Sequence, residues 1–447
     1  MIDQQTAIDT VRLALEMGAT DAECSIAEGD EFSASVRMRA LETLKEAGSR
    51  AAGLRVMVGQ RAGSSYTSDL TREGLRQMVV SALESAAVAT ADPDAGLPDA
   101  EELGSLGGDL GLYCDSLRTL DTEYKIQQAM AAEEAALSVD ARIVNSEGAS
   151  FDSYYGAKAF ANSRCFAGAY RSSSCSLSAV PVASAGDGME RDYWQSSGRN
   201  HTTLETPAYI GRRAAERALR RLGARKVQTQ KVPVVFEPRT ARSLLGHVFG
   251  AIDGESIYRK ASFLEGKMGE RVAAETVTIV DDGTLPGLFG TSPYDDEGAP
   301  TRRTVVIERG VLKSYLLNTY TARKLGLRTT GNASRGIAGN AGVDHGNFFL
   351  EAGGRTADEI IGSVRNGLYV TELIGSGVNI VTGDYSRGVV GLWIENGELA
   401  YPVSEITIAA NLRDMLMNIE SIGSDLEFRG SSAAPTVLIG EMTVSGQ

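Results

Sequence analysis

Residues 391–399 have the sequence Gly391-Leu392-Trp393-Ile394-Glu395-Asn396-Gly397-Glu398-Leu399, an apolar run that turns at Asn396-Gly397. An Asn-Gly pair between two such runs is typical of a type I′ β-hairpin, because both turn residues tolerate positive φ. Residues 304–312 repeat the pattern, with a turn at Arg309-Gly310. Two such hairpins indicate a curled antiparallel sheet in this part of the chain. A chance match between two strand sequences is the alternative explanation.

The rest of the C-terminal part also favours strands. An apolar run begins at residue 232, and residues 436–444 fit either a strand pair or one bent strand. The polar segment 225–231 separates this part from a helix-richer N-terminal part, so we place a domain boundary there. The sequence therefore predicts an α+β protein with domains at 1–225 and 226–447. The second domain is expected to be β-rich, with a curled antiparallel sheet.

The N-terminal domain is expected to pack helices on an antiparallel or mixed sheet. Apolar spacing predicts helices over residues 4–17, 71–89, 122–138 and from Pro207 to about residue 223. Thr71 is a good N-cap, and a proline is favourable in a first helical turn. Strands are expected at residues 22–26, 32–38, 51–58 and 64–67, with short meandering strands in the Ser- and Ala-rich zone 143–182.

Composition and charge limit the function. The chain of 447 residues is 43% hydrophobic and carries a net charge of −14. An acidic chain is unsuited to nucleic acid, because binding phosphates needs a clustered basic surface. One dense basic run lies in residues 212–226, but its arginines fall on several faces of a helix. A solvated helix is therefore favoured over a phosphate-binding face.

Cysteines and hydropathy indicate the compartment. Cys24, Cys114, Cys165 and Cys175 form no C-x-x-C pair, so zinc-ribbon and redox spacings are absent. Such thiols fit a reducing cytoplasm. The N-terminal residues lack the basic flank and apolar core of a signal peptide, and no apolar run reaches the length of about 18 residues expected of a transmembrane helix. We expect a cytoplasmic protein with no membrane partner.

A search for metal or nucleophile motifs finds little. The three histidines, His201, His247 and His345, are too far apart to share a helical turn, so a structural role for His247 is favoured over a metal role. The acidic clusters 281–282 and 295–297 lack the alternating oxygen ligands of a calcium loop, and solvated turns explain them better. Neither a serine-hydrolase elbow nor a phosphate-binding loop is present.

Several longer blocks carry a family resemblance. They are Tyr66-Thr67-Ser68-Asp69-Leu70-Thr71, Ser256-Ile257-Tyr258-Arg259-Lys260, Thr382-Gly383-Asp384-Tyr385-Ser386-Arg387-Gly388 and Tyr401-Pro402-Val403-Ser404-Glu405. Together they resemble the TldD/PmbA family, in family order over most of the chain. The S-I-Y-R-K and G-D-Y-S-R-G blocks are similar to the PmbA (TldE) branch in particular.

The resemblance implies a two-subunit cytoplasmic zinc metalloprotease in which the other, TldD-like subunit holds the metal. That subunit carries L-L-H-E-x-x-G-H and a cysteine near its C-terminus, and its glutamate would activate a zinc-bound water. Here the corresponding stretch is Leu244-Leu245-Gly246-His247-Val248-Phe249-Gly250-Ala251, and no cysteine follows Cys175. Gly246 and Ala251 offer no metal ligand, and His247 takes the place of the glutamate. We therefore expect neither a catalytic residue nor a cofactor on this chain, and zinc on the TldD-like partner.

What remains for such a chain is to shape a chamber in which unfolded peptides are cut. The family is associated with maturing peptide antibiotics and with removing antitoxins, and its older name is modulator of DNA gyrase. Candidate peptide-binding residues are His247, Asp253, Glu255, Tyr385 and Arg387, and a structural hydrogen-bonding role is the alternative for each. A stand-alone homodimeric regulator that binds peptides or proteins without hydrolysis is the second hypothesis. A different hydrolase that uses Ser386 or the acidic clusters is the third.

Overall fold

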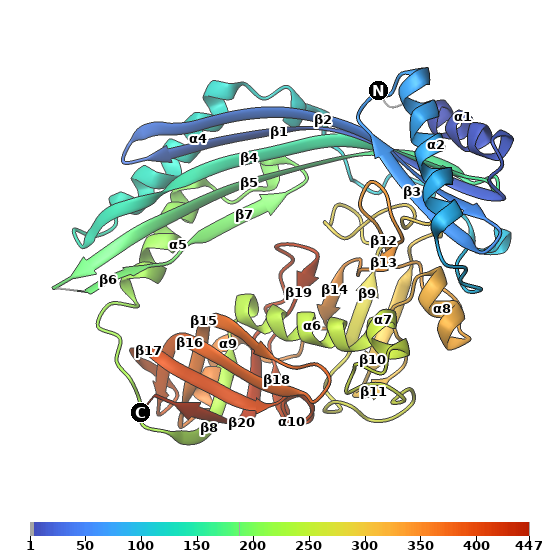
Figure 1. Ribbon diagram of the computed structural model, residues 1–447. Helices are drawn as coiled ribbons and strands as arrows, with labels where there is room; N and C mark the ends of the chain where they lie inside the picture. Colours follow the sequence, from blue (N-terminus) through green and yellow to red (C-terminus); the bar gives the residue numbers. More distant parts are fainter. Residues whose placement is uncertain (1–3, 187, 447) are drawn as a thin grey trace.

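The computed structural model describes residues 4–186 and 188–446 and has the predicted α+β character. Figure 1 shows long N-terminal strands that arch over a C-terminal half, which contains two larger sheets and a separate two-stranded pair. Elements up to α5 belong to what we term the N-terminal half, and elements from β8 onward to the C-terminal half. The division of the chain into domains at residue 225 stays a prediction.

The N-terminal half is built on one antiparallel sheet with the strand order β3-β2-β1-β4-β5-β6, in which β7 pairs with β5. Its strands are β1 (Asp21–Arg37), β2 (Ala40–Val58), β3 (Arg61–Thr67), β4 (Ile143–Asn162), β5 (Ala167–Ala185), β6 (Gly188–Arg191) and β7 (Trp194–Gly198). The predicted strands 51–58 and 64–67 are confirmed, and they lie in β2 and β3, which pair with each other.

Two strand predictions for this sheet are wrong in the same way. Residues 22–26 and 32–37 belong to one continuous strand, β1, and the zone 143–182 forms two long strands instead of a meander of short ones. The polar residues between the two predicted segments resemble a turn, but β1 is hydrogen-bonded along both edges. At Gly29 a side chain would collide with the ring of Tyr154, at 2.6 Å. Gly29 is therefore needed because the Tyr154 ring packs against it, and not because the chain turns there. The hydrogen bonds of β1 to both neighbouring strands outweigh the low strand propensity of its polar residues.

Helices cover one face of this sheet. They are α1 (Gln4–Glu16), α2 (Arg72–Val88), α3 (Asp115–Arg118), α4 (Thr122–Leu137) and α5 (Pro207–Leu219), with short 3-10 turns at Ala100–Glu102 and His201–Thr203. Thr71 caps α2 as predicted by accepting a hydrogen bond from the Gly74 amide at 3.2 Å. No helix among the described residues is long and apolar enough to cross a membrane.

Strand β5 shows why the two faces of the sheet differ. Cys175, Leu177 and Ala179 are buried in one cluster with residues of α4 and α5. The residues between them are serines, which remain partly exposed on the opposite face. The Ser- and Ala-rich composition of this segment therefore produces an alternation of period two, with an apolar face under the helices and a hydroxyl-bearing face opposite.

The C-terminal half contains a closed barrel and a smaller sheet. The barrel strands are β8 (Gln230–Phe236), β15 (Asn366–Val378), β16 (Asp384–Glu395), β17 (Glu398–Asn411) and β20 (Val437–Ser445), with β18 (Ile419–Ile422) beside β20. Pairing of β17 with β20 closes the ring, and only β8 and β15 run parallel among its pairs. Residues 437–444 thus belong to one bent strand, the second of the two alternatives predicted for residues 436–444.

The smaller sheet has the order β11-β10-β9-β14-β19. Its strands are β9 (Ile279–Asp282), β10 (Arg303–Glu308), β11 (Val311–Leu312), β14 (Phe348–Leu350) and β19 (Ser432–Ala433), and β12 (Ala333–Ser334) pairs separately with β13 (Gly342–Val343). The helices of this half are α6 (Pro238–Ile252), α7 (Gly254–Tyr258), α8 (Thr319–Leu325), α9 (Ala357–Gly362) and α10 (Leu412–Met417).

Both predicted hairpins form. Asn396 and Gly397 have φ values of 52° and 84°, and Arg309 and Gly310 have values of 47° and 80°, as a type I′ turn requires. They do not share a sheet, however, because β16 and β17 belong to the barrel and β10 and β11 to the smaller sheet. The curled antiparallel sheet is confirmed in the barrel, but the second hairpin contributes nothing to it.

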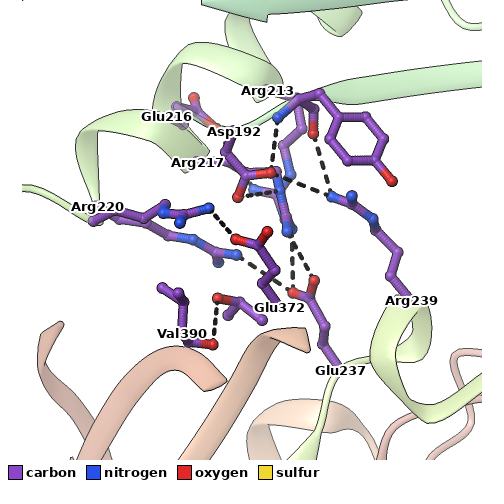
Figure 2. Close-up of polar contacts among 12 residues, drawn as sticks. Asp192, Arg213, Glu216, Arg217, Arg220, Glu237, Arg239, Glu372 and Val390 are labelled. Carbon is purple, nitrogen blue, oxygen red and sulfur yellow. Dashed lines mark hydrogen bonds and ion pairs between the residues drawn. The ribbon is translucent and has the colours of Figure 1, made fainter. Parts of the chain in front are cut away.

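A buried arginine joins the two halves. Arg217 of α5 is 2% exposed, and its guanidinium donates to Glu237 at 2.8 and 3.1 Å and to Asp192 at 3.1 Å (Figure 2). Burial disfavours the charged guanidinium, but Glu237 and Asp192 outweigh it and raise the pKa of Arg217. The solvated helix predicted for residues 212–226 is therefore wrong for this residue. Its charge is hidden because Glu237, which lies between β8 and α6, and Asp192 enclose the guanidinium, and sequence spacing cannot show this.

A glycine-rich segment, residues 331–346, forms a second contact between the halves. Its Arg335 pairs with Glu23 of β1, which also receives the Arg55 guanidinium at 2.8 Å. Burial tends to raise the pKa of Glu23, but the two arginines outweigh it and lower that pKa. Gly53 of β2 lies so close to this segment that an added Cβ would be 1.6 Å from the Ile337 carbonyl oxygen. Only glycine fits there.

The acidic clusters are not solvated turns. Asp281, Asp282, Asp295 and Glu297 are 2–5% exposed. Asp295 accepts backbone N–H groups of Glu297, Ala299 and Ala333, all at 2.9–3.0 Å. Asp281 and Asp282 end β9, which lies inside the smaller sheet between β10 and β14. The sequence cannot show this, because the covering strand β14 comes more than sixty residues later in the chain.

Replacing Arg217 with methionine should remove the main cation of the buried Glu237 and Asp192, which leaves, among the described residues, only the longer ion pairs with Arg220 at 3.4 Å and Arg239 at 3.7 Å. We expect Arg217→Met to lower the free energy of unfolding by about 3–5 kcal/mol, as found when one partner of a buried ion pair is removed. Urea denaturation followed by circular dichroism measures the loss. The control is Arg212→Ala, an exposed arginine of the same helix. Equal stabilities for the two variants would contradict a structural role for the buried network.

Asp281 should make stability depend on pH. Burial raises the pKa of its carboxyl to about 6, although Asn332 donates to Oδ2 at 2.7 Å. A raised carboxyl pKa stabilises the folded state at low pH, and this contribution is lost as pH rises through about 6. We expect Asp281→Asn to raise the free energy of unfolding relative to the parent chain by about 1–3 kcal/mol at pH 8, with little difference at about pH 4, close to the ordinary carboxyl pKa of 3.8. Urea titrations at both pH values test this, with the exposed Glu398→Gln as control. A difference that is independent of pH would show the expectation to be wrong.

Candidate functional site

Helix α6 carries the stretch that corresponds to the metal-binding motif. It begins at Pro238, directly after Glu237, and packs against β15 of the barrel and against β14 and β19 of the smaller sheet. Leu244, Leu245 and Val248 anchor its apolar face in the core. The helix therefore lies between the two C-terminal sheets, with its first turn held by the Arg217 contact.

The two positions that hold histidines in the metal-bearing motif lie in different surroundings. Gly246 is exposed, and a Cβ there would meet no other atom within 4 Å. Ala251 is completely buried among core residues. Within residues 4–186 and 188–446, no group of three or more His, Cys, Asp or Glu side chains is arranged to hold a metal ion. The residues present at this helix do not fit a zinc site.

His247 contacts a second predicted residue, Tyr385 of β16. Their rings meet edge to face, with centroids 5.8 Å apart. Neither His247 Nε2 nor the Tyr385 hydroxyl has a hydrogen-bond partner among the described residues. Burial, and then the charge of Arg387, lowers the pKa of His247, so its neutral form is favoured. Burial raises the pKa of Tyr385. His247, Tyr385 and Arg387 thus form one neighbourhood, with two uncharged polar groups beside a cation.

Asp253 and Glu255 lie elsewhere. Asp253 caps α7 by accepting from the Glu255 amide at 3.1 Å, and it also receives the Ser256 hydroxyl. Glu255 pairs with Arg259 at 2.8 Å and lines a separate cavity of about 410 Å³ together with Arg55. The structure therefore does not bring these two residues to His247. Whether any of the five candidates contacts peptide stays a prediction.

A larger groove runs between the two halves beside α6. It has a volume of about 860 Å³, with Arg191 and Asp192 on the N-terminal side. On the C-terminal side, α6 contributes Arg242 and Ser243, and Arg387 adds a wall from β16. Ser243 precedes His247 by one helical turn, so the groove extends along the helix toward the His247 neighbourhood.

A second cavity of about 760 Å³ lies under the arched sheet. Its lining includes the hydroxyl-bearing face of the strands, with Ser33, Ser174 and Ser176, and it shares Gly430 and Ser431 with the groove. The two spaces therefore adjoin at this loop. Together they form one recess between the halves, and its lining includes arginines and several serine hydroxyls.

Sequence reasoning named Arg387 but missed the other arginines of this recess. Arg239 and Arg242 stand three residues apart on the same helix as the degenerate motif, which places them on one face and could have pointed to them. Residues 430–432 carried no such signal, because their loop reaches the groove only through tertiary packing. Arg429 of this loop donates to Glu205 at 3.0 Å and stacks over Trp194 at 4.3 Å, which fixes the loop against the N-terminal half.

Comparison with known proteins agrees with this architecture. Models described as PmbA/TldA metallopeptidase domain 1, central domain and C-terminal domain match residues 22–86, 115–222 and 229–446. The metalloprotease PmbA of Escherichia coli O157:H7 is 40% identical over 442 residues, which cover 98% of this chain and 96% of that protein.

Solved structures give the same result. A Bacteroides thetaiotaomicron protein described as a modulator of DNA gyrase superposes with a TM-score of 0.92 at 30% identity, over 99% of both chains. TldE of Thermococcus kodakarensis reaches a TM-score of 0.88 over 99% of this chain and 100% of its own, and at 20% identity this likeness supports the fold alone. The chain therefore belongs to the PmbA/TldD metallopeptidase family, in its PmbA (TldE) branch.

Proposed function

We propose that this chain is the metal-free subunit of a heteromeric zinc metalloprotease that cuts unfolded peptides. The observation that carries the proposal is the state of α6, where Gly246 is exposed, Ala251 is buried and no donor set surrounds them. A chain of a metallopeptidase family that lacks the ligands needs a second subunit to supply them. A TldD-like partner with H-E-x-x-x-H would do so.

The recess between the halves supports a role in holding peptide. Strand β19 is the outermost strand of the smaller sheet in the described pairings, and its Ser432 lines the groove. An exposed strand edge can bind an extended peptide through backbone hydrogen bonds without demanding a particular sequence. Such binding admits unfolded chains and rejects folded ones, because a folded protein has few free strands to offer.

The contribution to catalysis would be positioning. A peptide held along α6 and β19 would present its scissile bond to a metal-bound water on the partner. Restricting the motion of a substrate in this way can supply a large part of a rate enhancement. In this arrangement the residues of this chain bind, orient and exclude bulk water, and the partner performs the hydrolysis.

Restoring the motif residues alone should not restore the metal site. The triple variant Gly246→His/His247→Glu/Ala251→His should bind no stoichiometric zinc, because position 251 lies in the closed core. It should also lose about 1–3 kcal/mol of unfolding free energy through overpacking. Elemental analysis after dialysis and urea denaturation measure these outcomes. Gly246→His by itself is the control and should be tolerated. Tight, equimolar zinc in the triple variant would refute the argument from burial.

Co-expression with a TldD-like paralogue tests the proposal as a whole. Each subunit and the pair are purified, and complex formation by light scattering, zinc content and cleavage of a fluorogenic unstructured peptide are measured. We expect a complex, zinc in proportion to the partner, and efficient cleavage only by the pair. The pair with the partner's motif glutamate changed to glutamine should assemble without cleaving.

Two results would overturn the proposal. Chelator-sensitive cleavage by this chain alone would show that it holds its own catalytic metal. Failure to form a complex, combined with a stable homodimer that binds peptide, would favour a stand-alone regulator instead.

A further inference from the structure

The charges of the groove are unbalanced. Five arginines and three carboxylates line it, which leaves two positive charges in a chain whose net charge is −14. The three carboxylates each face an arginine of the same groove. The pairs are Arg191 with Glu147, Arg221 with Glu372 at 2.6 Å and Arg239 with Asp192 at 3.7 Å.

Arg242 and Arg387 are the two arginines of the groove that do not face one of its carboxylates. Neither forms an ion pair with a carboxylate among the described residues. Within residues 4–186 and 188–446, Arg387 donates only its Nε, to the Ile374 carbonyl oxygen at 3.3 Å, so its terminal N–H groups have no acceptor there. Arg242 is exposed on α6, one residue before Ser243. In an acidic protein two such guanidinium groups in one groove mark a place where negative charge is attracted.

Their position connects them to the vacated motif. Arg242 precedes Gly246 by about one turn of α6, and Arg387 lies two residues after Tyr385, which contacts His247. Arg387 is also close enough to His247 to lower its pKa. A group bound by the two arginines would therefore lie next to the part of α6 where the metal-bearing relatives carry their ligands.

We propose that Arg242 and Arg387 bind a carboxylate of an extended peptide in this groove and so give the chain a preference for acidic substrates. The inference rests on the proposed function and adds a substrate class to it. A guanidinium presents N–H groups in a planar fork that matches the two oxygens of a carboxylate. The carboxylate comes either from an aspartate or glutamate side chain or from the C-terminus of the peptide.

A peptide fits this groove better than nucleic acid does. Binding a phosphate backbone needs a row of free cations, whereas here two are free and the carboxylates Glu147 and Glu372 stand in the same walls. The groove volume of about 860 Å³ is that of a ligand site and not of a surface track. Ser432 of β19, the outermost strand of the smaller sheet in the described pairings, lines the groove, so a polypeptide bound there would lie beside a strand edge.

Three labelled unstructured peptides of equal length test the proposal by fluorescence anisotropy on the full chain. One contains aspartates and has an amidated C-terminus, one has asparagine in their place, and one has asparagine with a free C-terminus. We expect the chain to prefer a carboxylate-bearing peptide about tenfold or more, with a preference that weakens as salt rises. The second and third peptides separate side-chain from C-terminal recognition.

Variants then assign the effect to the groove. Arg242→Gln and Arg387→Gln should each weaken binding of the preferred peptide about five- to tenfold, and the double variant should abolish the preference. Arg387→Lys keeps the charge but not the fork, so it should recover only part of the affinity. Arg72→Gln/Arg76→Gln on α2 removes the same charge outside the groove and should leave the preference intact.

Equal affinity for all three peptides, or a preference that survives in the double variant, would overturn the inference. So would a single-stranded oligonucleotide that binds the groove more tightly than the preferred peptide. The outcome is independent of the test of function, because binding is measured without the partner. If the pair cleaves peptides but shows no acidic preference, the proposed function stands and the groove proposal is refuted. If the chain prefers acidic peptides but the pair does not cleave them, the groove proposal stands and the proposed function is refuted.

Discussion

The ion pairs of Arg217 with Glu237 and Asp192 are the constraint on which the arrangement of this protein depends. Glu237 immediately precedes α6, so its carboxylate ties the first turn of that helix to α5 of the other half. One buried guanidinium thereby fixes the position of α6, one wall of the groove, relative to the wall that contains Asp192. Because separating the halves would expose or strand these charges, the recess keeps its shape without a peptide in it.

Much of the secondary structure follows from local chemistry. Thr71 as a helix cap, Pro207 at a first turn and the Asn396-Gly397 hairpin all depend on neighbouring residues, so sequence reasoning finds them. The long strand β1 could not be predicted, because its polar middle is held by pairing with β2 and β4. The closed barrel depends on contacts between strands that are far apart in the chain, and periodicity does not encode these.

The candidate site also has features that the sequence reveals and features that only the folded structure reveals. The loss of the metal ligands at Gly246 and Ala251 can be read from the sequence. His247, Tyr385 and Arg387 are also named from the sequence as candidate residues, and the structure brings these three together. The sequence does not show that Asp253 and Glu255 lie apart from that group, because the chain changes direction where α6 ends and α7 begins. The buried aspartates at 281 and 295 and the free arginine at 242 became visible only with the tertiary structure, since burial and pairing are properties of neighbours that come from elsewhere in the chain.

The place of β20 in the barrel has a consequence for biosynthesis. This strand pairs with β8 on one side and with β17 on the other, and both precede it in the chain. The barrel therefore cannot close on the ribosome until residue 445 has been made and released from the exit tunnel. Until then two strand edges stay open, which invites pairing with other chains. The nascent chain thus resembles, for a short time, the unfolded polypeptides that we propose the finished molecule binds, and it leaves that state when this one strand inserts between β8 and β17.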